Sequence, residues 1–425
     1  MVNATRPVPT IGSADTVLDP DEAGAFVTEQ LDALPAEGRS VCVVVPDGTR
    51  SCPLPLLIDR VHRSLAGRAR EVVVLVALGT HQPMSPERLA AHIGCPGQSP
   101  ETAFPGMTVR NHAWWDPDSL VSVGVVSADR VRELSEGRLS EAVDVRVNRH
   151  VVEADLALVV GPVFPHEVVG FSGGNKYFFP GVAGPEIIDL SHWLGALISS
   201  VEIIGTRGIT PVRALIDEAA AMIPTERRAL CLVVRSGTTD LHAMTFGEPE
   251  GAWAAAADVS AATHVRYLDA PVRRVVSVMP DKYEDIWTAA KGFYKLEPVV
   301  ADGGEVVIVA PGIDTVSVTH PEIEEIGYHC RDYFTAQWER FRHVPWGVLA
   351  HSTHLRGAGT YDPVEGERAR VRVTLATGIP RATVEAVDLG WADPAAVDLD
   401  AERADPTTLV VDPAGEILYR LRGPA

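Results

Sequence analysis

Short apolar runs and polar turns alternate along the first part of the chain. Three runs consist almost entirely of aliphatic and β-branched residues, as in strands buried on both faces of a parallel sheet, and they span residues 40–45, 71–78 and 156–160. Stretches that we predict to be helical lie around them, at residues 20–35, at 55–65 and from about 85 onward. Strands and helices in alternation predict the α/β class.

The same alternation continues to the end of the chain. We predict strands at 121–126, 143–147 and 230–234 and helices at 211–222 and 251–262. Around Asp269-Ala270-Pro271 the pattern restarts, with strands predicted at 274–279, 305–310, 370–376, 382–387 and 408–411 and helices at about 284–297 and 330–342. Because 425 residues are too many for one ordinary core, we predict two α/β domains, 1–266 and 267–425. Their sheets should be largely parallel, with an active-site cleft between them.

Polar side chains follow the three most apolar predicted strands at the point where each ends. These turns are Asp47-Gly48-Thr49-Arg50, Gly79-Thr80-His81 and the segment 161–176. Ligands of open α/β sheets collect beyond the carboxyl ends of the strands. The coincidence of three such turns therefore predicts a binding site there.

Composition excludes several classes of partner. The net charge of −20 argues against nucleic acid and against an anionic membrane surface. No apolar run is long enough to span a membrane, and the first residues lack the basic and apolar regions of a signal peptide. The five cysteines form no Cys-x-x-Cys pair, which fits reduced thiols. We therefore expect a cytoplasmic protein that acts on a small molecule.

The segment from Gly161 to His192 holds the densest set of candidate functional groups. It contains His166, a Ser-Gly-Gly turn, Lys176, a Pro-Gly pair and His192. A lysine in a glycine loop can act as a phosphate counter-charge or as an amine nucleophile, although a structural turn with a surface lysine gives the same pattern. Only four of the 37 basic residues are lysine, which favours a chemical role for the amine.

The two earlier turns also contain candidate functional side chains. Arg50 offers a planar fork for a carboxylate, and Asp47 is close enough in sequence to orient it. His81 is placed as a general base, because the unperturbed pKa of histidine lies near neutrality. In isolation, an Asp-Gly turn with an exposed arginine and a solvated loop histidine would look the same.

The run HEVVGFSGGNKYFFPGVAG, followed by a histidine sixteen residues after its lysine, resembles the signature of the nickel-pincer lactate racemase family. The resemblance implies a pyridinium-3,5-dithiocarboxylate mononucleotide joined covalently to Lys176, with Ni(II) bound by two sulfurs, a ring carbon and His192. It implies a cofactor site formed by Thr80, Ser172, Gly173, Gly174, Lys176, Pro180 and Gly181. It also implies that enzymes of cofactor biosynthesis act on the protein during maturation.

The resemblance further implies a 2-hydroxyacid racemase or epimerase, an isomerase in which His81 and His166 are the catalytic bases. One histidine takes the hydroxyl proton while hydride leaves the carbinol carbon for the cofactor. The 2-keto acid turns in the site, and hydride returns to its other face. Asp47, Arg50 and Lys291 match residues that lie beside the substrate carboxylate in the family.

This chain departs from the family pattern at one substrate position. Lactate-racemizing members have glutamine three residues before the lysine, whereas Thr288, preceded by Trp287, stands three residues before Lys291 here. A hydroxyl cannot replace the reach of the amide, so we expect a 2-hydroxy acid other than lactate. The spacing of the five histidines from 320 to 354 matches no common metal site, so we expect solvated or core roles for them, with a metal site or substrate contacts by some of them as further options.

Two alternatives and one assembly option stay open at this point. A lyase or aldolase could use Lys176 in a Schiff base, without nickel and without His192. A non-catalytic homologue could bind the nucleotide as a carrier or sensor, although retention of both histidines argues against it. The sequence also leaves a homodimer open.

Overall fold

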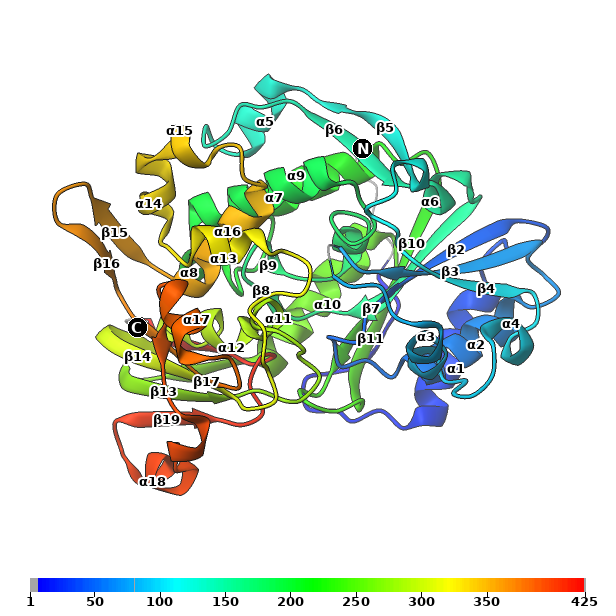
Figure 1. The fold of residues 1–425 in the computed structure, drawn as a ribbon. Helices are drawn as coiled ribbons and strands as arrows, with labels where there is room; N and C mark the ends of the chain where they lie inside the picture. The colour runs from blue at the N-terminus through cyan, green and yellow to red at the C-terminus, as the bar shows by residue number, and fades with distance from the viewer. Residues whose placement is uncertain (1–6, 80, 424–425) are drawn as a thin grey trace.

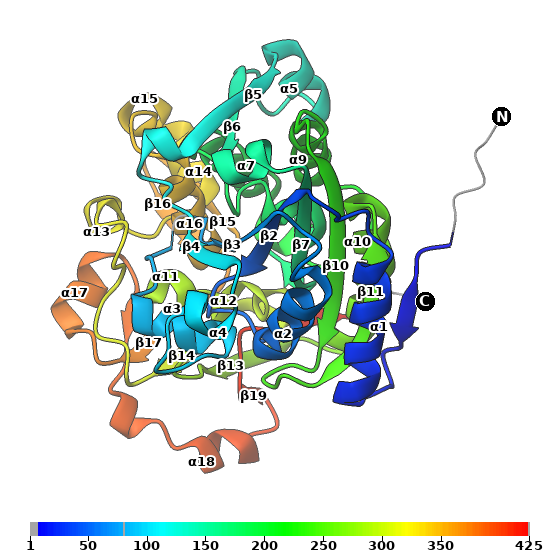
Figure 2. The same cartoon turned by 90° about the vertical axis from the view of Figure 1, so that its right-hand side faces the viewer.

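The computed structural model describes residues 7–79 and 81–423 and is built on two separate, largely parallel sheets (Figures 1 and 2). The first has seven strands in the order β4-β3-β2-β7-β10-β11-β1. These are β1 (Thr10–Gly12), β2 (Ser40–Pro46), β3 (Glu71–Ala77), β4 (Met107–Asn111), β7 (Leu156–Pro162), β10 (Glu226–Val234) and β11 (Leu241–Gly247). All neighbours pair in parallel except β10–β11 and β11–β1.

The strand order reverses between β2 and β7, since the chain runs from β2 to β3 and β4 on one side and from β7 to β10 on the other. Loops at such a point diverge to opposite faces of a sheet and leave a crevice beyond the strand ends. The turns after β2, β3 and β7 therefore meet at one place.

Helices cover both faces of this sheet, because successive side chains of a strand point to opposite faces. Val43 and Val45 of β2 belong to the core under α1 (Pro20–Asp32), α2 (Leu54–Leu65) and α3 (Pro86–Ile93), beside the short α4 (Pro100–Ala103). Cys42 and Val44 belong to the core under α7 (Pro185–Ile198), α9 (Pro211–Ala221) and α10 (Pro249–His264). That second core continues into the second sheet.

The second sheet is parallel throughout, in the order β18-β17-β14-β13-β19. Its strands are β13 (Val272–Val278), β14 (Val300–Ala310), β17 (Arg372–Thr377), β18 (Gly390–Trp391) and β19 (Thr408–Val411). Around it lie α11 (Ile286–Ala289), α12 (Lys291–Tyr294), α13 (Glu322–Ile326), α14 (Arg331–Ala336), α15 (Trp338–Phe341), α16 (Trp346–Arg356), α17 (Arg381–Ala386) and α18 (Leu399–Ala404). In this second part, α16 packs against α7 and so contacts the first part of the chain.

Four two-stranded ribbons complete the fold: β5 (Leu120–Val126) with β6 (Val143–Asn148), β8 (Pro165–His166) with β9 (Gly170–Phe171), β12 (Val265–Leu268) with β20 (Leu418–Leu421), and β15 (Gly359–Asp362) with β16 (Gly366–Ala369). Short helices α5 (Ala128–Leu134), α6 (Arg149–Glu153) and α8 (Ser200–Ile203) lie between them in sequence. In the described residues, no helix is both long and apolar enough to cross a bilayer.

The α/β class with largely parallel sheets, predicted from the sequence, is confirmed. The strand predicted at 382–387 is wrong: residues 381–386 form α17. Val384 and Val387 are buried while residues 385 and 386 are exposed, so the burial follows the three-residue step of a helix. The helices predicted at 284–297 and 330–342 are each divided into shorter ones. The domain division at 266/267 stays a prediction and falls within β12.

Candidate active site

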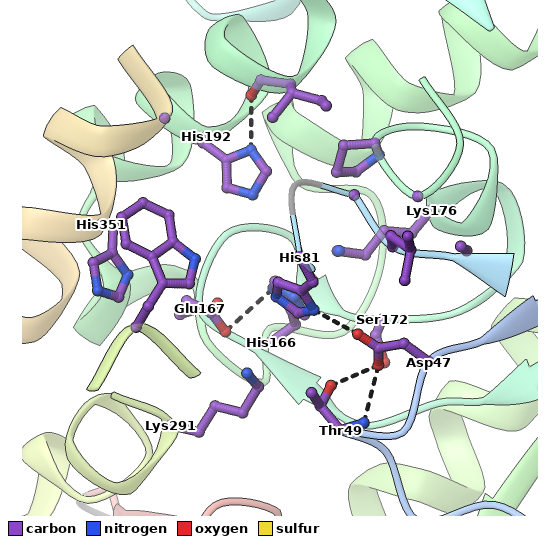
Figure 3. A pocket seen from close by; sticks show the side chains of 18 of the residues that line it. Asp47, Thr49, His81, His166, Glu167, Ser172, Lys176, His192, Lys291 and His351 are labelled. Atoms are coloured by element: carbon purple, nitrogen blue, oxygen red, sulfur yellow. Dashed lines mark hydrogen bonds and ion pairs between the residues drawn. The ribbon is translucent and has the colours of Figure 1, made fainter. Parts of the chain in front are cut away.

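A single cavity brings together side chains from the ends of β2, β3 and β7, from α7, and from α12 and α16 of the second part of the chain (Figure 3). Most of the predicted site residues line it: Asp47, Arg50, His81, His166, Ser172, Gly173, Lys176, Pro180, Gly181, His192, Trp287 and Lys291. Segments more than 200 residues apart in the sequence therefore meet in one site.

The glycine loop that carries Lys176 is fixed from behind by a buried arginine. Arg213, 1% exposed, donates to the carbonyl oxygens of Phe171 (2.5 Å) and Gly173 (3.2 Å) and stacks over Trp253. Gly173 has a φ of +89°, and a Cβ there would lie 2.5 Å from Val163 Cγ2. The loop thus needs glycine both for its backbone conformation and for its close packing.

Asn175 fixes the next position of the loop. Its amide nitrogen donates to Asp217 (3.0 Å) and Glu250 (2.7 Å), and its amide oxygen accepts from Arg227 (3.0 Å). These three partners of Asn175 do not line the cavity, whereas the neighbouring Lys176 extends into it (Figure 3).

Lys176 has the electrostatic environment of a reactive amine. Burial, followed by the positive charge of Arg50, lowers the pKa of Lys176 to about 7 against the opposing effect of Glu167. A large fraction of the amine is therefore neutral near pH 7. A neutral lysine amine is the nucleophilic form.

His192 projects from α7, a helix that the sequence analysis did not predict. Its Nδ1 lies 2.7 Å from the carbonyl oxygen of Ile188, one helical turn earlier. Because a carbonyl only accepts, Nδ1 carries the proton and Nε2 keeps its lone pair. Burial lowers the pKa of His192 to about 4, so the ring is neutral at pH 7. A neutral imidazole with one nitrogen fixed by a carbonyl is the usual form of a metal ligand.

His81 and Asp47 form an oriented pair at the ends of β3 and β2. His81 Nδ1 lies 2.5 Å from Asp47 Oδ2, and the other carboxylate oxygen accepts from the hydroxyl (2.7 Å) and backbone nitrogen (3.1 Å) of Thr49. Burial tends to raise the pKa of Asp47, but His81, Thr49 and Arg50 together lower it below its ordinary value. The ionised carboxylate holds the proton on Nδ1 and leaves Nε2 free to accept one.

His166, at the end of β8, is the most enclosed of the site histidines named so far, with 4% exposure. Its Nδ1 accepts from the backbone nitrogen of Val168 (3.2 Å) and lies 3.3 Å from a carboxylate oxygen of Glu167. Burial, then Lys176 and Arg50, lower the pKa of His166 well below its ordinary value. The ring is therefore neutral before an anion enters the cavity.

Arg50 and Lys291 add two further cations. Burial tends to lower the pKa of Arg50, yet Asp47 and Glu167 raise it, so the guanidinium is charged. Burial and then Arg50 lower the pKa of Lys291 to about 8, and its amine donates to the carbonyl oxygen of Thr288 (3.2 Å). The cavity is thus suited to an anion.

Two predicted site residues lie outside this cavity, and the structure does not describe a third. Thr288 does not line this cavity; its hydroxyl donates to Asp285 (2.7 Å), and it borders a neighbouring hollow. Gly174 packs against Trp253 beneath the loop, where a Cβ would lie 2.8 Å from Trp253 Cβ. Thr80 lies outside the described residues.

The structure adds two site residues that were not predicted and selects three from the group of histidines that the sequence left open. Glu167 and Tyr294 line the cavity, as do His320, His351 and His354 from the group between 320 and 354, whereas His329 and His343 do not. The ring of Trp287 stacks on His351 at 3.8 Å between centroids. Glu167 directly follows a predicted catalytic residue and could have been noticed, but no local motif distinguishes His354.

In the described residues, no group of three or more His, Cys, Asp or Glu side chains is arranged to hold a metal ion. A single ligand such as His192 suits a metal that another bound group holds at its remaining positions.

Comparison with known proteins agrees with these features. Residues 25–204 match the family model described as the lactate racemase N-terminal domain. The chain is 25% identical over 293 residues to the lactate racemase of Lactiplantibacillus plantarum, covering 68% of this chain and 63% of that one. It is 27% identical over 169 residues to the lactate racemase of Thermoanaerobacterium thermosaccharolyticum, covering 39% and 35%. The matches thus span less than two thirds of the length of these curated relatives.

Two solved structures share the fold over nearly the whole chain. A protein from Thermotoga maritima superposes with a TM-score of 0.87 at 34% identity, covering 96% of this chain and 100% of the other. The lactate racemase apoprotein from Thermoanaerobacterium thermosaccharolyticum superposes with a TM-score of 0.69 at 18% identity, covering 98% and 95%. The second likeness concerns the fold alone.

Proposed function

We propose, from the premise that this chain belongs to the lactate racemase family, that it is an isomerase that inverts the C2 carbinol of a 2-hydroxy acid. The observation that carries the proposal is the convergence of Lys176, His192, His81 and His166 on one cavity that also holds Arg50 and Lys291. The reaction needs a tethered cofactor, a proton acceptor for each enantiomer and a site for a carboxylate.

The residues present fit a nickel-pincer nucleotide on Lys176. Lys176 is half-buried, its amine has a pKa of about 7, and the amine forms no side-chain hydrogen bond or ion pair in the described part of the chain. His192 would be the protein ligand of Ni(II), and Ser172, Gly173, Pro180 and Gly181 would line the cofactor. When bound, the group supplies a reversible hydride acceptor for the carbinol carbon, which leaves a 2-keto acid in the site.

The two histidines supply the proton chemistry. His81 Nε2 accepts the hydroxyl proton of one enantiomer, and the ionised Asp47 stabilises the imidazolium that results. His166 takes the corresponding role for the other enantiomer at Nδ1, the nitrogen that holds the lone pair and accepts from the backbone nitrogen of Val168 in the free site. Its low pKa keeps it neutral in the free site, and a bound carboxylate offsets the cations that depress this pKa.

Arg50 and Lys291 bind the substrate carboxylate in this proposal. The guanidinium supplies paired donors, and the Lys291 amine approaches from the second part of the chain. Thr288 cannot contribute, since its hydroxyl is bound to Asp285 outside the cavity. We therefore propose a substrate other than lactate.

The Schiff-base lyase and the non-catalytic carrier are the alternatives that the test must separate. The neutral amine of Lys176 would serve a Schiff base equally well. The bond from His192 Nδ1 to the carbonyl oxygen of Ile188 leaves a lone pair on Nε2. Neither alternative has a use for that lone pair, whereas the racemase proposal uses it to bind nickel. The racemase proposal also includes a cytoplasmic location and maturation by enzymes that make the cofactor.

The test is to purify the protein after co-expression with enzymes that make the cofactor. Intact-mass analysis should show an adduct on Lys176, and metal analysis about one nickel per chain. His192→Ala should keep the adduct and lose most of the nickel. An unmodified chain with full isomerase activity would exclude the covalent cofactor, and unchanged nickel in His192→Ala would exclude that ligand.

Turnover is then measured on a panel of 2-hydroxy acids, including longer, branched and sugar-derived ones. His81→Ala and His166→Ala should each lower kcat by at least about a hundredfold while keeping the adduct. Near-normal turnover in either variant removes that histidine from the mechanism. A keto acid trapped on Lys176 by borohydride would instead favour the Schiff-base alternative.

A further inference from the structure

One wall of the cavity is a row of stacked rings. The indole of Trp287 lies 4.1 Å from the imidazole of His320 and 3.8 Å from that of His351, measured between ring centroids, and all three residues line the cavity. The interplanar angles are 30° and 24°. Two imidazoles this close to one indole would overlap if they shared a face, so they cover its opposite faces. Figure 3 shows His351 on the side of the cavity opposite Lys176.

This arrangement holds the indole of Trp287 at a fixed position. The backbone nitrogen of Trp287 donates to the carbonyl oxygen of Val316 (3.0 Å). Behind the stack, His351 Nε2 lies 3.5 Å from the hydroxyl oxygen of the fully buried Tyr328. A ring that is packed on both faces forms a hard boundary, whereas a free side chain would turn aside for a ligand.

Trp287 also separates the cavity from a second hollow. Among the described residues, four line both spaces: Asp47, Thr49, His81 and Trp287. The first three belong to the first part of the chain and are joined to one another by hydrogen bonds. Trp287 comes from the second part and completes the partition.

The hollow beyond this partition lies between the two parts of the chain and reaches solvent. Met84 and Arg88 line it from the first part, and Glu284 and Thr319 line it from the second. Arg88 and Glu284 form an ion pair of 2.7 Å, with 59% and 53% of their side chains exposed. Loss of the Trp287 indole would therefore join the cavity to open space.

The side chain of the substrate is the group that runs toward this partition. In the proposed reaction, Arg50 and Lys291 bind the carboxylate, and the carbinol carbon lies between two histidines. Lys291 follows Trp287 by four residues, and the histidine His81 is part of the partition itself, so both anchoring points border Trp287. Since the hydrogen on C2 faces the cofactor, the side chain is the substituent left to approach the indole.

We propose that Trp287 limits the length of the side chain of the substrate, because its indole, clamped between His320 and His351, closes the cavity in the direction that the side chain takes. The substrates are then short-chain 2-hydroxy acids. The inference rests on the proposed function, since it assigns the substrate class of the same site. Trp287 determines specificity and takes no part in proton or hydride transfer.

The test uses the apoprotein and a series of unbranched acids. Calorimetric titration compares 2-hydroxybutanoate, 2-hydroxyhexanoate and 2-hydroxyoctanoate. The wild type should bind the eight-carbon acid at least about tenfold more weakly than the four-carbon acid, because a rigid wall does not move aside for the longer chain. Trp287→Ala vacates the space between the two imidazoles and should abolish or reverse this difference, since each buried methylene strengthens binding about fourfold.

Two further variants separate the length limit from a general disturbance of the site. Trp287→Leu fills more of the vacated space, disturbs the fold less than alanine and should also reduce the difference. Trp115→Ala, at a tryptophan that is 51% exposed and lines neither space, should leave the series unchanged. Equal affinity of the wild type for the three acids, or no detectable binding of any of them, overturns the proposal. A tenfold difference that survives in whichever of Trp287→Ala and Trp287→Leu has the circular dichroism spectrum of the wild type overturns it as well.

Failure of this inference is distinguishable from failure of the proposed function. If the matured enzyme isomerises 2-hydroxyoctanoate as well as 2-hydroxybutanoate, the racemase proposal stands and the length limit is wrong. If the apoprotein shows the Trp287-dependent limit but the matured enzyme isomerises no 2-hydroxy acid, the length limit stands and the reaction is wrong.

Discussion

At the scale of single residues, the site depends on two lysine amines whose charge is set by their surroundings. Lys291 is buried and Lys176 is half-buried, both lie near other cations, and the pKa of Lys176 is lowered further, to about 7, than that of Lys291, to about 8. Desolvation and like charge both disfavour the protonated form. Lys176 is therefore the more nucleophilic of the two at neutral pH, while Lys291 is mostly a cation.

This difference predicts how the apoprotein reacts with amine reagents. Because the pKa of Lys176 is lowered, its neutral fraction rises through pH 7 instead of near the ordinary lysine value. Labelling of Lys176, followed by peptide mass analysis from pH 5 to 10, should show a midpoint near 7. Denatured protein is the control, where all four lysines should label alike at high pH. A native midpoint near 10 contradicts the prediction.

Residues with a local signature could be predicted from the sequence, and residues that depend on tertiary contacts could not. Lys176, His166 and His192 lie in one motif, while Asp47, Arg50 and His81 follow strongly apolar strands, so all six were found. His354 lies in the last turn of a helix that was not predicted, and the packing of α16 on α7 brings it to the cavity. Thr288 was placed in the site, yet its bond to Asp285 directs it away.

At the scale of elements, the glycine loop between β9 and α7 determines where Lys176 lies. Gly173 cannot accept a side chain without strain, since its φ is +89° and a Cβ would lie 2.5 Å from Val163 Cγ2. Arg213 binds the carbonyl oxygens on either side of Ser172, so a shift of this loop also breaks a buried hydrogen-bond network. A substitution that destabilises this loop should therefore also move the amine of Lys176.

Gly173→Ala is therefore expected to damage the site more than the fold. Strain at a positive φ and the close contact should lower the free energy of unfolding by about 1–3 kcal/mol. The displaced loop should lower cofactor attachment to Lys176 severalfold, measured by intact mass after maturation. Gly251→Ala, in α10 with its nearest atom at 3.5 Å, is the matched control and should be neutral. Normal attachment in Gly173→Ala shows that the loop tolerates the change.

The elements themselves were predictable where hydrophobic periodicity was strong. The buried strands β2, β3 and β7 fell at their predicted positions, because parallel strands covered on both faces have continuous apolar sequences. The segment 382–387 was taken for a strand because its valines and threonine favour strands locally, but packing at a three-residue step makes it α17. β4 and β11 carry more mixed sequences and were not predicted.

At the scale of the whole molecule, a buried carboxylate near the C-terminus joins the two parts of the chain. Glu416 accepts from Lys282 Nζ (2.7 Å), from the backbone nitrogen of Gly237 (2.8 Å) and from that of Ser51 (3.2 Å). Its carbonyl oxygen also lies 3.4 Å from Lys295 Nζ, which donates to Pro165 beside His166. The segment around Glu416 thus supports both the Arg50 turn and the His166 turn.

Glu416→Gln should weaken this connection in a pH-dependent way. Burial tends to raise the pKa of Glu416, but Lys282 and the other donors lower it to about 2, so its stabilisation is present above the ordinary glutamate pKa and is lost as the pH falls toward 2. Urea unfolding at pH 7 should show a loss of about 2 kcal/mol relative to wild type, and the difference should shrink below pH 4. The substrate KM should rise, because the turn that holds Arg50 loses an anchor.

Glu339→Gln, at an exposed glutamate with 81% side-chain exposure, is the control and should change neither the free energy of unfolding nor the KM. Equal stability of Glu416→Gln and wild type at pH 7 would mean that the two parts are held together by their shared apolar core alone.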